Sequence, residues 1–212
     1  MTTFYESIKT GIMLFPFFAV LFTLPIFMGT VIHYKAINFV RIAMNYIFLL
    51  YMVCVFALVF LPLPTMEQAA QLHSHNVQWI PFQFIADIVK ESPLQLTVLS
   101  TYLKAVTNRG VLQVVFNILL TVPFGMFLSY YFEMSKRKVV VATFVLSLAI
   151  EITQLTGIYG LFHGSYRLCD IDDLMTNTFG GYIGAVVVSA VRRFLPDLKK
   201  FDLRLRKKVK YA

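Results

Sequence analysis

Three polar residues recur at helical spacing within one otherwise apolar stretch of the chain. Ser147, Glu151 and Gln154 are separated by four and then three residues, so a helix would carry all three side chains on one face. A charged side chain inside a membrane helix costs roughly 2.5–3.5 kcal/mol by insertion scales, so Glu151 needs an explanation. Such a carboxyl group can act as a general acid or base, and its hydroxyl and amide neighbours can bind a polar ligand.

Two further stretches carry polar residues with the same periodicity. These residues are Asp170, Asp173 and Asn177 in one stretch, and Gln113, Asn117 and Thr121 in the other. The helical rise is ~1.5 Å per residue. Counted from Lys138, Arg192 and Glu133, at one end of each stretch, Glu151, Asn177 and Asn117 lie about 20, 22 and 24 Å along their helices. Three helices would thus place buried polar side chains at nearly one level, which predicts a shared site.

Two other interpretations of these residues are open. Asn, Gln, Ser and Thr can simply hold membrane helices together by hydrogen bonds, and Gly180 to Gly184 is a GxxxG spacing typical of close helix packing. An ion pair of Arg167 with Glu151 or Asp170 could also be purely structural. A divalent metal would use oxygen-rich ligands, here Glu151, Asp170, Asp172 and Asp173 together with His163. The spacing matches no calcium loop and Arg167 lies nearby, so we expect no metal and no cofactor.

Composition indicates which elements must position these residues. Of 212 residues, 58% are hydrophobic and 14% are charged, whereas a soluble domain carries about a quarter charged residues. Apolar blocks long enough to cross a membrane, which needs roughly 20 helical residues, run over 11–32, 40–63, 111–132, 139–160 and 171–191. The sequence therefore predicts an all-α, polytopic membrane helix bundle of about five transmembrane helices.

The charges of the loops predict the orientation of this bundle. Two short turns are basic, one with Lys35 and Arg41 and the other with residues 136–138, whereas the other loops are balanced or acidic. Because positive residues gather in cytoplasmic loops, we expect an N-out/C-in arrangement. The long segment from Thr65 to Gly110, between helices 2 and 3, would then be extracytoplasmic. Within it, residues 76–82 include Trp79 and are expected to be interfacial or re-entrant.

The C-terminal segment concentrates the positive charge of the chain. From Arg192 onward nine Lys and Arg residues stand against two Asp residues, a net charge of +7. Such a tail directly after a membrane helix is typical of a cytoplasmic anchor on anionic lipid, and we expect no nucleic-acid partner. We therefore predict a single transmembrane domain over residues 1–195 and a basic cytoplasmic tail over 196–212.

The polar motifs together resemble those of the VanZ-like family of bacterial membrane proteins. The order is Glu151-x-x-Gln154, then Arg167-x-x-Asp170-x-x-Asp173, then Asn177-x-x-Gly180. Supporting pieces are Ile80-Pro81-Phe82 and the run from Asn117 to Gly125, so the resemblance covers about residues 51–190. It implies a multi-pass protein of the bacterial plasma membrane. The namesake of the family is associated with resistance to teicoplanin, a glycopeptide antibiotic with a lipid tail.

The first functional hypothesis is binding without turnover. A site near the outer leaflet would hold the polar head of a lipid-linked cell-envelope precursor or of a lipoglycopeptide, with membrane lipids as further partners. Arg167 would pair with a phosphate or carboxylate through its planar donor fork. The other ligand-binding candidates are Gln154, Asn177, Asn117 and Ser147.

The alternative is a membrane enzyme that hydrolyses or transfers a group on a lipid-linked cell-wall precursor. Glu151 would be the general acid or base, and Asp170 and Asp173 would orient the substrate or a water. A transporter is less favoured, because the polar residues lie at one level and do not line a path across the membrane.

Overall fold

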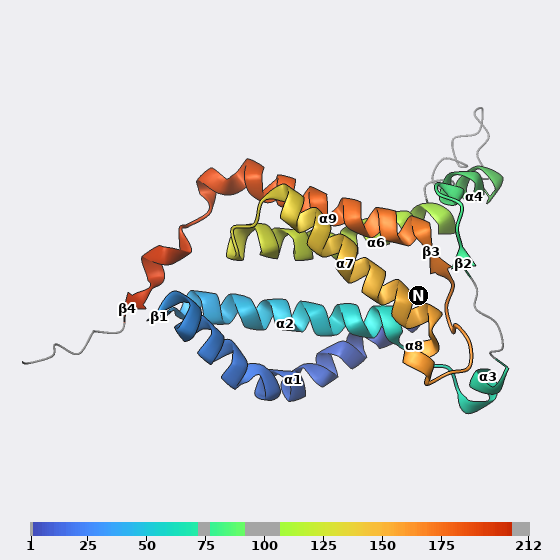
Figure 1. The fold of residues 1–212 in the computed structure, drawn as a ribbon, viewed down its shortest axis with the longest axis horizontal. Coiled ribbons are helices and arrows are strands. Elements are labelled where there is room, and N and C mark those ends of the chain that lie inside the picture. Colours follow the sequence, from blue (N-terminus) through green and yellow to red (C-terminus); the bar gives the residue numbers. More distant parts are fainter. Residues whose placement is uncertain (1, 72–76, 92–106, 205–212) are drawn as a thin grey trace, which may run out of the picture. The chain divides into compact units, whose positions relative to one another are not determined.

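The protein is built almost entirely of helices. The computed structural model describes residues 2–71, 77–91 and 107–204. Five of its helices are long and apolar enough to span a membrane: α1 (Thr2–Tyr34), α2 (Phe39–Phe60), α6 (Arg109–Tyr131), α7 (Lys136–Leu155) and α9 (Ile171–Val191) (Figure 1). The predicted all-α architecture with five membrane helices is confirmed. The N-out/C-in orientation stays a prediction.

The helix bounds follow the apolar blocks closely, with two differences. Helix α1 begins well before the predicted start at Gly11, and α7 ends at Leu155 instead of Gly160. The chain reverses after Leu155 through the short helix α8 (Gly157–Gly160), where Gly157 has a φ of +60°. A side chain at Gly157 would lie 2.5 Å from the carbonyl oxygen of Phe162, so this sharp turn requires glycine.

Short elements connect the long helices. Between α2 and α6 lie α3 (Met66–Ala70), β2 (Val77–Gln78) and α4 (Gln83–Glu91), and β3 (Cys169–Asp170) directly precedes α9. The remaining elements are β1 (Ala36–Ile37), two 3-10 helices, η1 (Arg192–Phe194) and η2 (Leu198–Phe201), and β4 (Leu203–Arg204). Asn76 of the predicted interfacial segment and residues 205–212 of the predicted basic tail lie outside the described residues.

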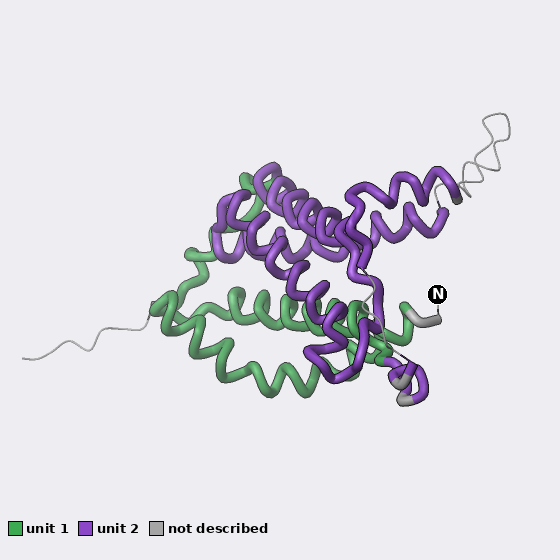
Figure 2. Tube along the Cα trace, turned by 45° about the vertical axis from the view of Figure 1, so that its right-hand side comes forward, with its two compact units in different colours: residues 1–63, 191–212 green, residues 64–190 purple. Residues whose placement is uncertain are grey.

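The chain divides into two compact units (Figure 2). The first, residues 1–63 and 191–212, contains the hairpin of α1 and α2 and the C-terminal segment. Helix α1 is bent in Figure 1 and contains Pro16 and Pro25, which remove backbone hydrogen bonds. Strand β1 connects α1 to α2 along the chain, and β4 pairs antiparallel with it. The C-terminal segment is therefore joined to this hairpin.

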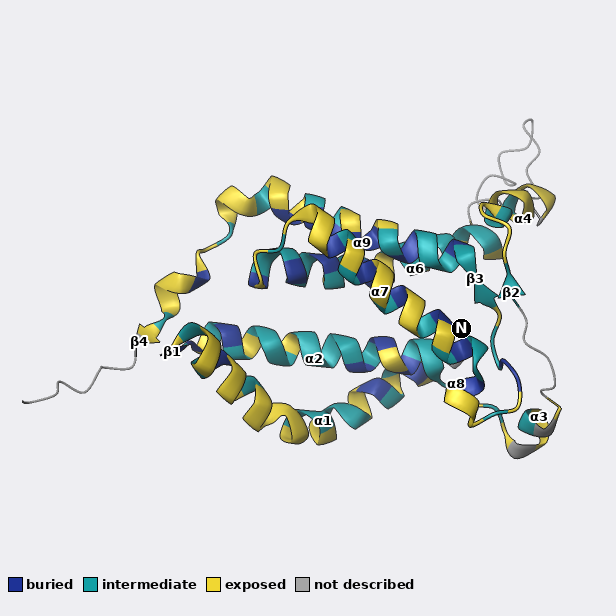
Figure 3. Cartoon of the chain, in the orientation of Figure 1, coloured by how far each residue is buried: buried dark blue, intermediate teal, exposed yellow. Residues whose placement is uncertain are grey.

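The second unit, residues 64–190, is a bundle of α6, α7 and α9. Its buried positions are the inward faces of these helices, whereas most outward faces are exposed apolar surface (Figure 3). Gly180 and Gly184 of α9 both meet the backbone of α6, where an added side chain would lie 2.3 Å from the Ile118 carbonyl oxygen or 2.2 Å from that of Val122. The packing role predicted for this GxxxG pair is confirmed.

Candidate functional site

Strand β3 and the first turn of α9 bring the segment between α2 and α6 to the end of the bundle. Strand β2 pairs parallel with β3, with Val77 opposite Cys169 and Gln78 opposite Asp170. The buried Asp172 carboxylate accepts hydrogen bonds from the backbone N–H groups of Phe82 at 2.6 Å and Phe84 at 2.9 Å. These bonds satisfy backbone donors at the start of α4 and fix this helix to α9.

Asp173, one residue further, joins α9 to α6. Its Oδ1 atom accepts hydrogen bonds from the side-chain amides of Gln113, at 3.2 Å, and Asn117. Both amides project from the same face of α6, one turn apart. The predicted ligand residue Asn117 and the predicted catalytic residue Asp173 are therefore direct partners of one another.

One turn deeper, a second set of hydrogen bonds joins all three helices. The Asn177 amide of α9 donates to the Ser147 hydroxyl of α7 at 3.0 Å, and Thr121 of α6 donates to the Asn177 carbonyl oxygen at 2.7 Å. Asn177 Oδ1 is buried and has no hydrogen-bond partner among the described residues. Ser147 and Asn177 thus lie together, in contacts that hold the bundle.

Glu151 of α7 contacts strand β3. Its Oε2 atom accepts a hydrogen bond from the backbone N–H of Asp170 at 3.0 Å, and its carboxylate also accepts one from the Cys169 thiol. The side chain is only 4% exposed, and Gln154 is buried on the same helix. Glu151 therefore positions the strand that leads into α9.

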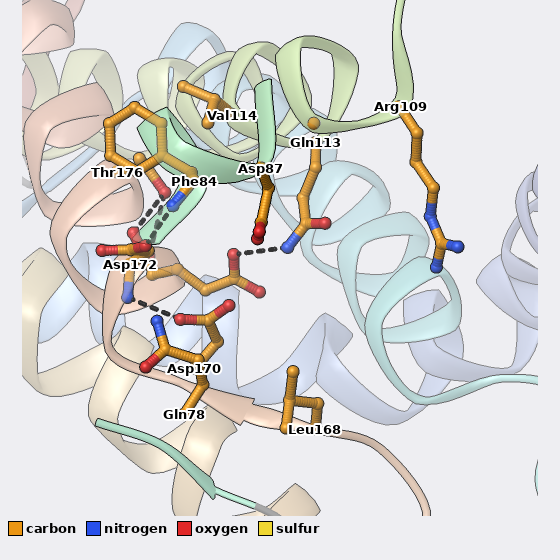
Figure 4. A pocket seen from close by; sticks show the side chains of 12 residues that line it. Gln78, Phe84, Asp87, Arg109, Gln113, Val114, Leu168, Asp170, Asp172 and Thr176 are labelled. Carbon is orange, nitrogen blue, oxygen red and sulfur yellow. Dashed lines mark hydrogen bonds between the residues drawn. The ribbon is translucent and has the colours of Figure 1, made fainter. Parts of the chain in front are cut away.

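A cavity of about 210 Å³ lies between α4, α6 and α9 (Figure 4). We call it the polar cavity. The residues that line it are Gln78, Phe84, Asp87, Arg109, Gly110, Gln113, Val114, Leu168, Asp170, Asp172, Asp173 and Thr176. In Figure 4 the carboxylate of Asp87 lies beside the Gln113 side chain, the carboxylate of Asp172 lies by Phe84, and the guanidinium of Arg109 stands apart from them. The arrangement offers many hydrogen-bond acceptors and a separate cationic donor.

Two of the predicted site residues, Asp170 and Asp173, line the polar cavity. The others are not among its lining residues: Asn117, Ser147 and Asn177 take part in the hydrogen bonds between helices, and Glu151 and Gln154 are buried on α7. Among the described residues that line it the cation is Arg109, and Arg167 is not one of them. The functional roles of these residues stay predictions.

Sequence reasoning missed Arg109, Asp87, Gln78, Phe84 and Leu168. A signal for Arg109 was present, because it lies two residues before the third apolar block and Asp170 lies one residue before the fifth. Counting from the outer ends of the helices would have placed both at one level. Asp87 and Phe84 had no such signal, because their place depends on how α4 packs.

A sequence model of the VanZ/LLP1 family matches residues 48–192. The chain belongs to this family. No curated protein and no solved structure matches the chain. The VanZ/LLP1 match includes α6, α7 and α9 and every lining residue of the polar cavity, so the cavity lies within the family's own part of the chain. Together with the five apolar helices, it makes this VanZ-family member a multi-pass membrane protein.

Asp170, which lines the polar cavity, has a raised pKa. Burial raises the pKa of Asp170, against the lowering effect of the hydrogen bond from the Asp172 backbone, and the Asp172 and Asp87 carboxylates raise it further.

Within the described residues of the chain, no group of three or more His, Cys, Asp or Glu side chains is arranged to hold a metal ion. His163, considered with these acids from the sequence, is an exposed residue.

Cys169 provides a chemical test of the charge on Glu151. Burial, followed by the negative charge of Glu151 and a hydrogen bond to it, raises the pKa of the Cys169 thiol to about 11. Since only the thiolate reacts, we expect slow alkylation at pH 8, with about one thiol in a thousand ionised, and a roughly tenfold rise per pH unit up to pH 10. Maleimide labelling of a Cys54→Ala protein, followed by mass spectrometry, measures this.

The matched variant is Glu151→Gln in the same Cys54→Ala background. Removal of the carboxylate charge lowers the pKa of Cys169, so labelling at pH 8 should become faster. Identical labelling rates with and without the carboxylate would contradict the inferred contact between Cys169 and a charged Glu151.

Proposed function

We propose that this VanZ-family protein binds the polar head of a lipid-linked cell-envelope molecule or lipoglycopeptide in the polar cavity and thereby contributes to teicoplanin-type resistance. The observation that supports the proposal is the polar cavity itself, at the ends of α6 and α9, beside the apolar outer surfaces of these helices. A ligand that lies in the membrane with its head at the surface could enter such a site directly.

The distribution of basic residues supports an outward-facing polar cavity. Within the second unit, Lys136, Arg137 and Lys138 begin α7 at the end of the bundle opposite to the start of α6 and α9, where the polar cavity lies. By the positive-inside rule the basic end faces the cytoplasm. The polar cavity would then face the outer leaflet of a bacterial plasma membrane, as the N-out/C-in arrangement requires.

The lining chemistry favours a particular kind of head group. The carboxylates of Asp87, Asp170, Asp172 and Asp173 outnumber the guanidinium of Arg109, so a bare phosphate would meet net repulsion. Hydroxyl, amide or ammonium groups would instead donate to the carboxylates, while one carboxylate or phosphate of the ligand could pair with Arg109. At about 210 Å³ the polar cavity is smaller than the ~300–1,000 Å³ of a typical ligand pocket, so it fits one sugar or amino-acid unit.

An apolar groove next to α9 is suited to the tail of such a ligand. It has a volume of about 520 Å³, is lined mainly by apolar side chains of α7 and α9, and begins at Ile171, between two residues of the polar cavity. A lipid-linked molecule has both a polar head and an apolar chain. The first turns of α9 therefore offer surfaces for both parts.

Teicoplanin binding to the protein in lipid nanodiscs tests the proposal. We expect Arg109→Gln to weaken binding about tenfold, because a hydrogen bond to a charged group contributes roughly 1.5 kcal/mol. Arg137→Gln, an exposed arginine on α7 outside the polar cavity, is the matched control and should bind like wild type. A glycopeptide without a lipid tail should bind more weakly.

Arg167→Gln tests the arginine that the sequence predicts as the anion-binding residue, whereas Arg109→Gln tests the arginine that lines the polar cavity. A loss confined to Arg167→Gln would move the anionic contact away from the polar cavity to Arg167. Equal binding of teicoplanin by wild type and all variants, or none by any of them, would remove the support for a ligand site here.

The enzymatic alternative has less support from the geometry. Glu151 is not among the residues that line the polar cavity, and its carboxylate accepts hydrogen bonds from the Asp170 backbone and the Cys169 thiol. These bonds hold β3 in place. A general acid or base must reach the proton that it transfers, so the geometry supports the binding role better than turnover.

A further inference from the structure

Helix α4 carries more apolar surface than its contacts with the protein cover. Phe84 and Ile88, one turn apart, face the bundle: Phe84 lines the polar cavity and Ile88 lies against Gly110 at the start of α6. Ile85 and Val89 form the neighbouring row and are 50% and 71% exposed. The apolar arc of α4 is therefore about twice as wide as the part that packs on the described protein.

The residues just before α4 add further apolar side chains. Trp79, Ile80 and Phe82 are also exposed, with Trp79 at 69%. Together with Ile85 and Val89 they form what we call the α4 apolar edge. The opposite side of the helix is polar, with Gln83, Asp87 and Lys90 at helical spacing. This two-sided pattern is typical of a helix that lies in the boundary between water and lipid.

The position of α4 along the bundle is set by specific contacts. The Asp172 carboxylate holds the backbone of Phe82 and Phe84, and the Asn108 side chain, which caps α6, donates to the Ile88 carbonyl oxygen at 3.3 Å. Helix α4 is therefore fastened to the first residues of two spanning helices. The ends of a helix that spans a hydrocarbon core of ~30 Å are expected at its boundary, so we expect α4 at head-group depth.

Helix α6, against which α4 packs through Ile88, carries a lipid-facing surface of its own. Leu112, Val115, Phe116 and Leu119 of α6 are exposed apolar side chains on a helix that spans the membrane. The exposed apolar side chains of α4, held at the start of α6, have one natural partner, the bilayer that surrounds α6.

We infer that α4 is a membrane-surface helix whose α4 apolar edge inserts into the boundary between lipid head groups and acyl chains. Its polar side then faces water, and Phe84 and Asp87 form the wall of a polar cavity that opens at head-group depth. The inference concerns the surface of α4 and does not depend on which ligand the cavity binds.

The chain supplies its own probe for this inference. Trp79 is the single tryptophan, so tryptophan emission of the full-length protein, excited at a wavelength that the tyrosines do not absorb, reports on the α4 apolar edge. In vesicles of phosphatidylcholine brominated near the head-group end of the acyl chains, we expect at least a twofold loss of emission. Bromines near the chain ends should quench less, and dissolved iodide should quench weakly.

A double variant, Ile85→Asp with Val89→Asp, weakens the insertion at two side chains that are 50% and 71% exposed. It should show at least twofold less quenching by shallow bromines and more quenching by iodide. Lys90→Gln on the polar side of the same helix is the matched control and should behave like wild type. Both variants are checked for wild-type helical content by circular dichroism.

Two results would overturn the inference. Strong iodide quenching with no effect of brominated lipid would place the α4 apolar edge in water. Shielding from both quenchers would mean that protein covers it, either a second copy or another part of this chain, and light scattering distinguishes these two cases.

Discussion

A Gly184→Ala variant is expected to lose at least about 2 kcal/mol of stability, because α6 and α9 touch through their backbones at this point. The added methyl group would lie 2.2 Å from the Val122 carbonyl oxygen and 2.7 Å from the Met126 nitrogen. Both atoms are backbone, so the helices must separate, and overpacking of this kind costs roughly 1–3 kcal/mol or more. The separation would also stretch the hydrogen bond between Thr121 and Asn177.

Gly29→Ala is the matched control for this methyl addition. Gly29 lies within α1, where an added side chain meets no atom within 4 Å. There alanine should leave stability unchanged or raise it by up to about 1 kcal/mol through its better helix propensity. Thermal unfolding in detergent, followed by circular dichroism, compares the two variants. Equal melting temperatures would contradict the close α6–α9 contact.

The second large effect is expected at the C-terminal segment of the first unit, on replacement of Asp202 by alanine. Arg41 is 2% exposed, its Nε lies 3.5 Å from the Asp202 carboxylate, and its guanidinium lies over the Tyr34 ring at 3.8 Å. The buried Asn38 amide donates to the same carboxylate at 2.6 Å. Removal of one partner from a buried ion pair costs about 3–5 kcal/mol. Because the Asp202 side chain is 16% exposed, we expect about 3 kcal/mol.

The test combines thermal unfolding with limited proteolysis of the C-terminal segment. Asp202→Ala should melt earlier and be cleaved faster after η2, because the Asn38 side-chain N–H groups lose the Asp202 acceptor and keep the bond to the Leu198 carbonyl oxygen as their link to this segment. Asp197→Ala removes a nearby exposed acid that caps η2 and should cost at most about 1 kcal/mol. The double variant Arg41→Met with Asp202→Ala should be more stable than Asp202→Ala alone, since the buried guanidinium that Asp202 neutralises is removed together with it. Failure of that rescue would argue against the ion pair.

This buried pair shows why loop charges are hard to place from sequence. Sequence reasoning treats Arg41 as one of the basic residues of a cytoplasmic turn. In the structure it begins α2 and is buried against the C-terminal segment, which lies far along the chain. The positive-inside rule uses the number of charges near a helix end, so it cannot distinguish an arginine in water from one in a buried pair.

The helices themselves could be predicted because their signals are local. Five apolar blocks correspond to five long helices, and the predicted bounds of the fifth, Ile171 to Val191, agree with those of α9. The GxxxG spacing and the polar residues at three- and four-residue intervals depend only on helical periodicity. The motif order likewise indicated the family that the match over residues 48–192 establishes.

The arrangement of the candidate site depended on packing between distant segments. The bonds from Phe82 and Phe84 to Asp172 join residues about ninety positions apart, and no local pattern marks an aspartate as the cap of another helix. The same packing places Arg109, Asp87 and Asp170 around one polar cavity, whereas Glu151 bonds to the Asp170 backbone and is not a lining residue. The sequence by itself determined the helices and which of their faces are polar. Only the tertiary structure decided which polar groups satisfy one another and which remain to line a cavity, because hydrogen-bond partners across helices follow from three-dimensional contact.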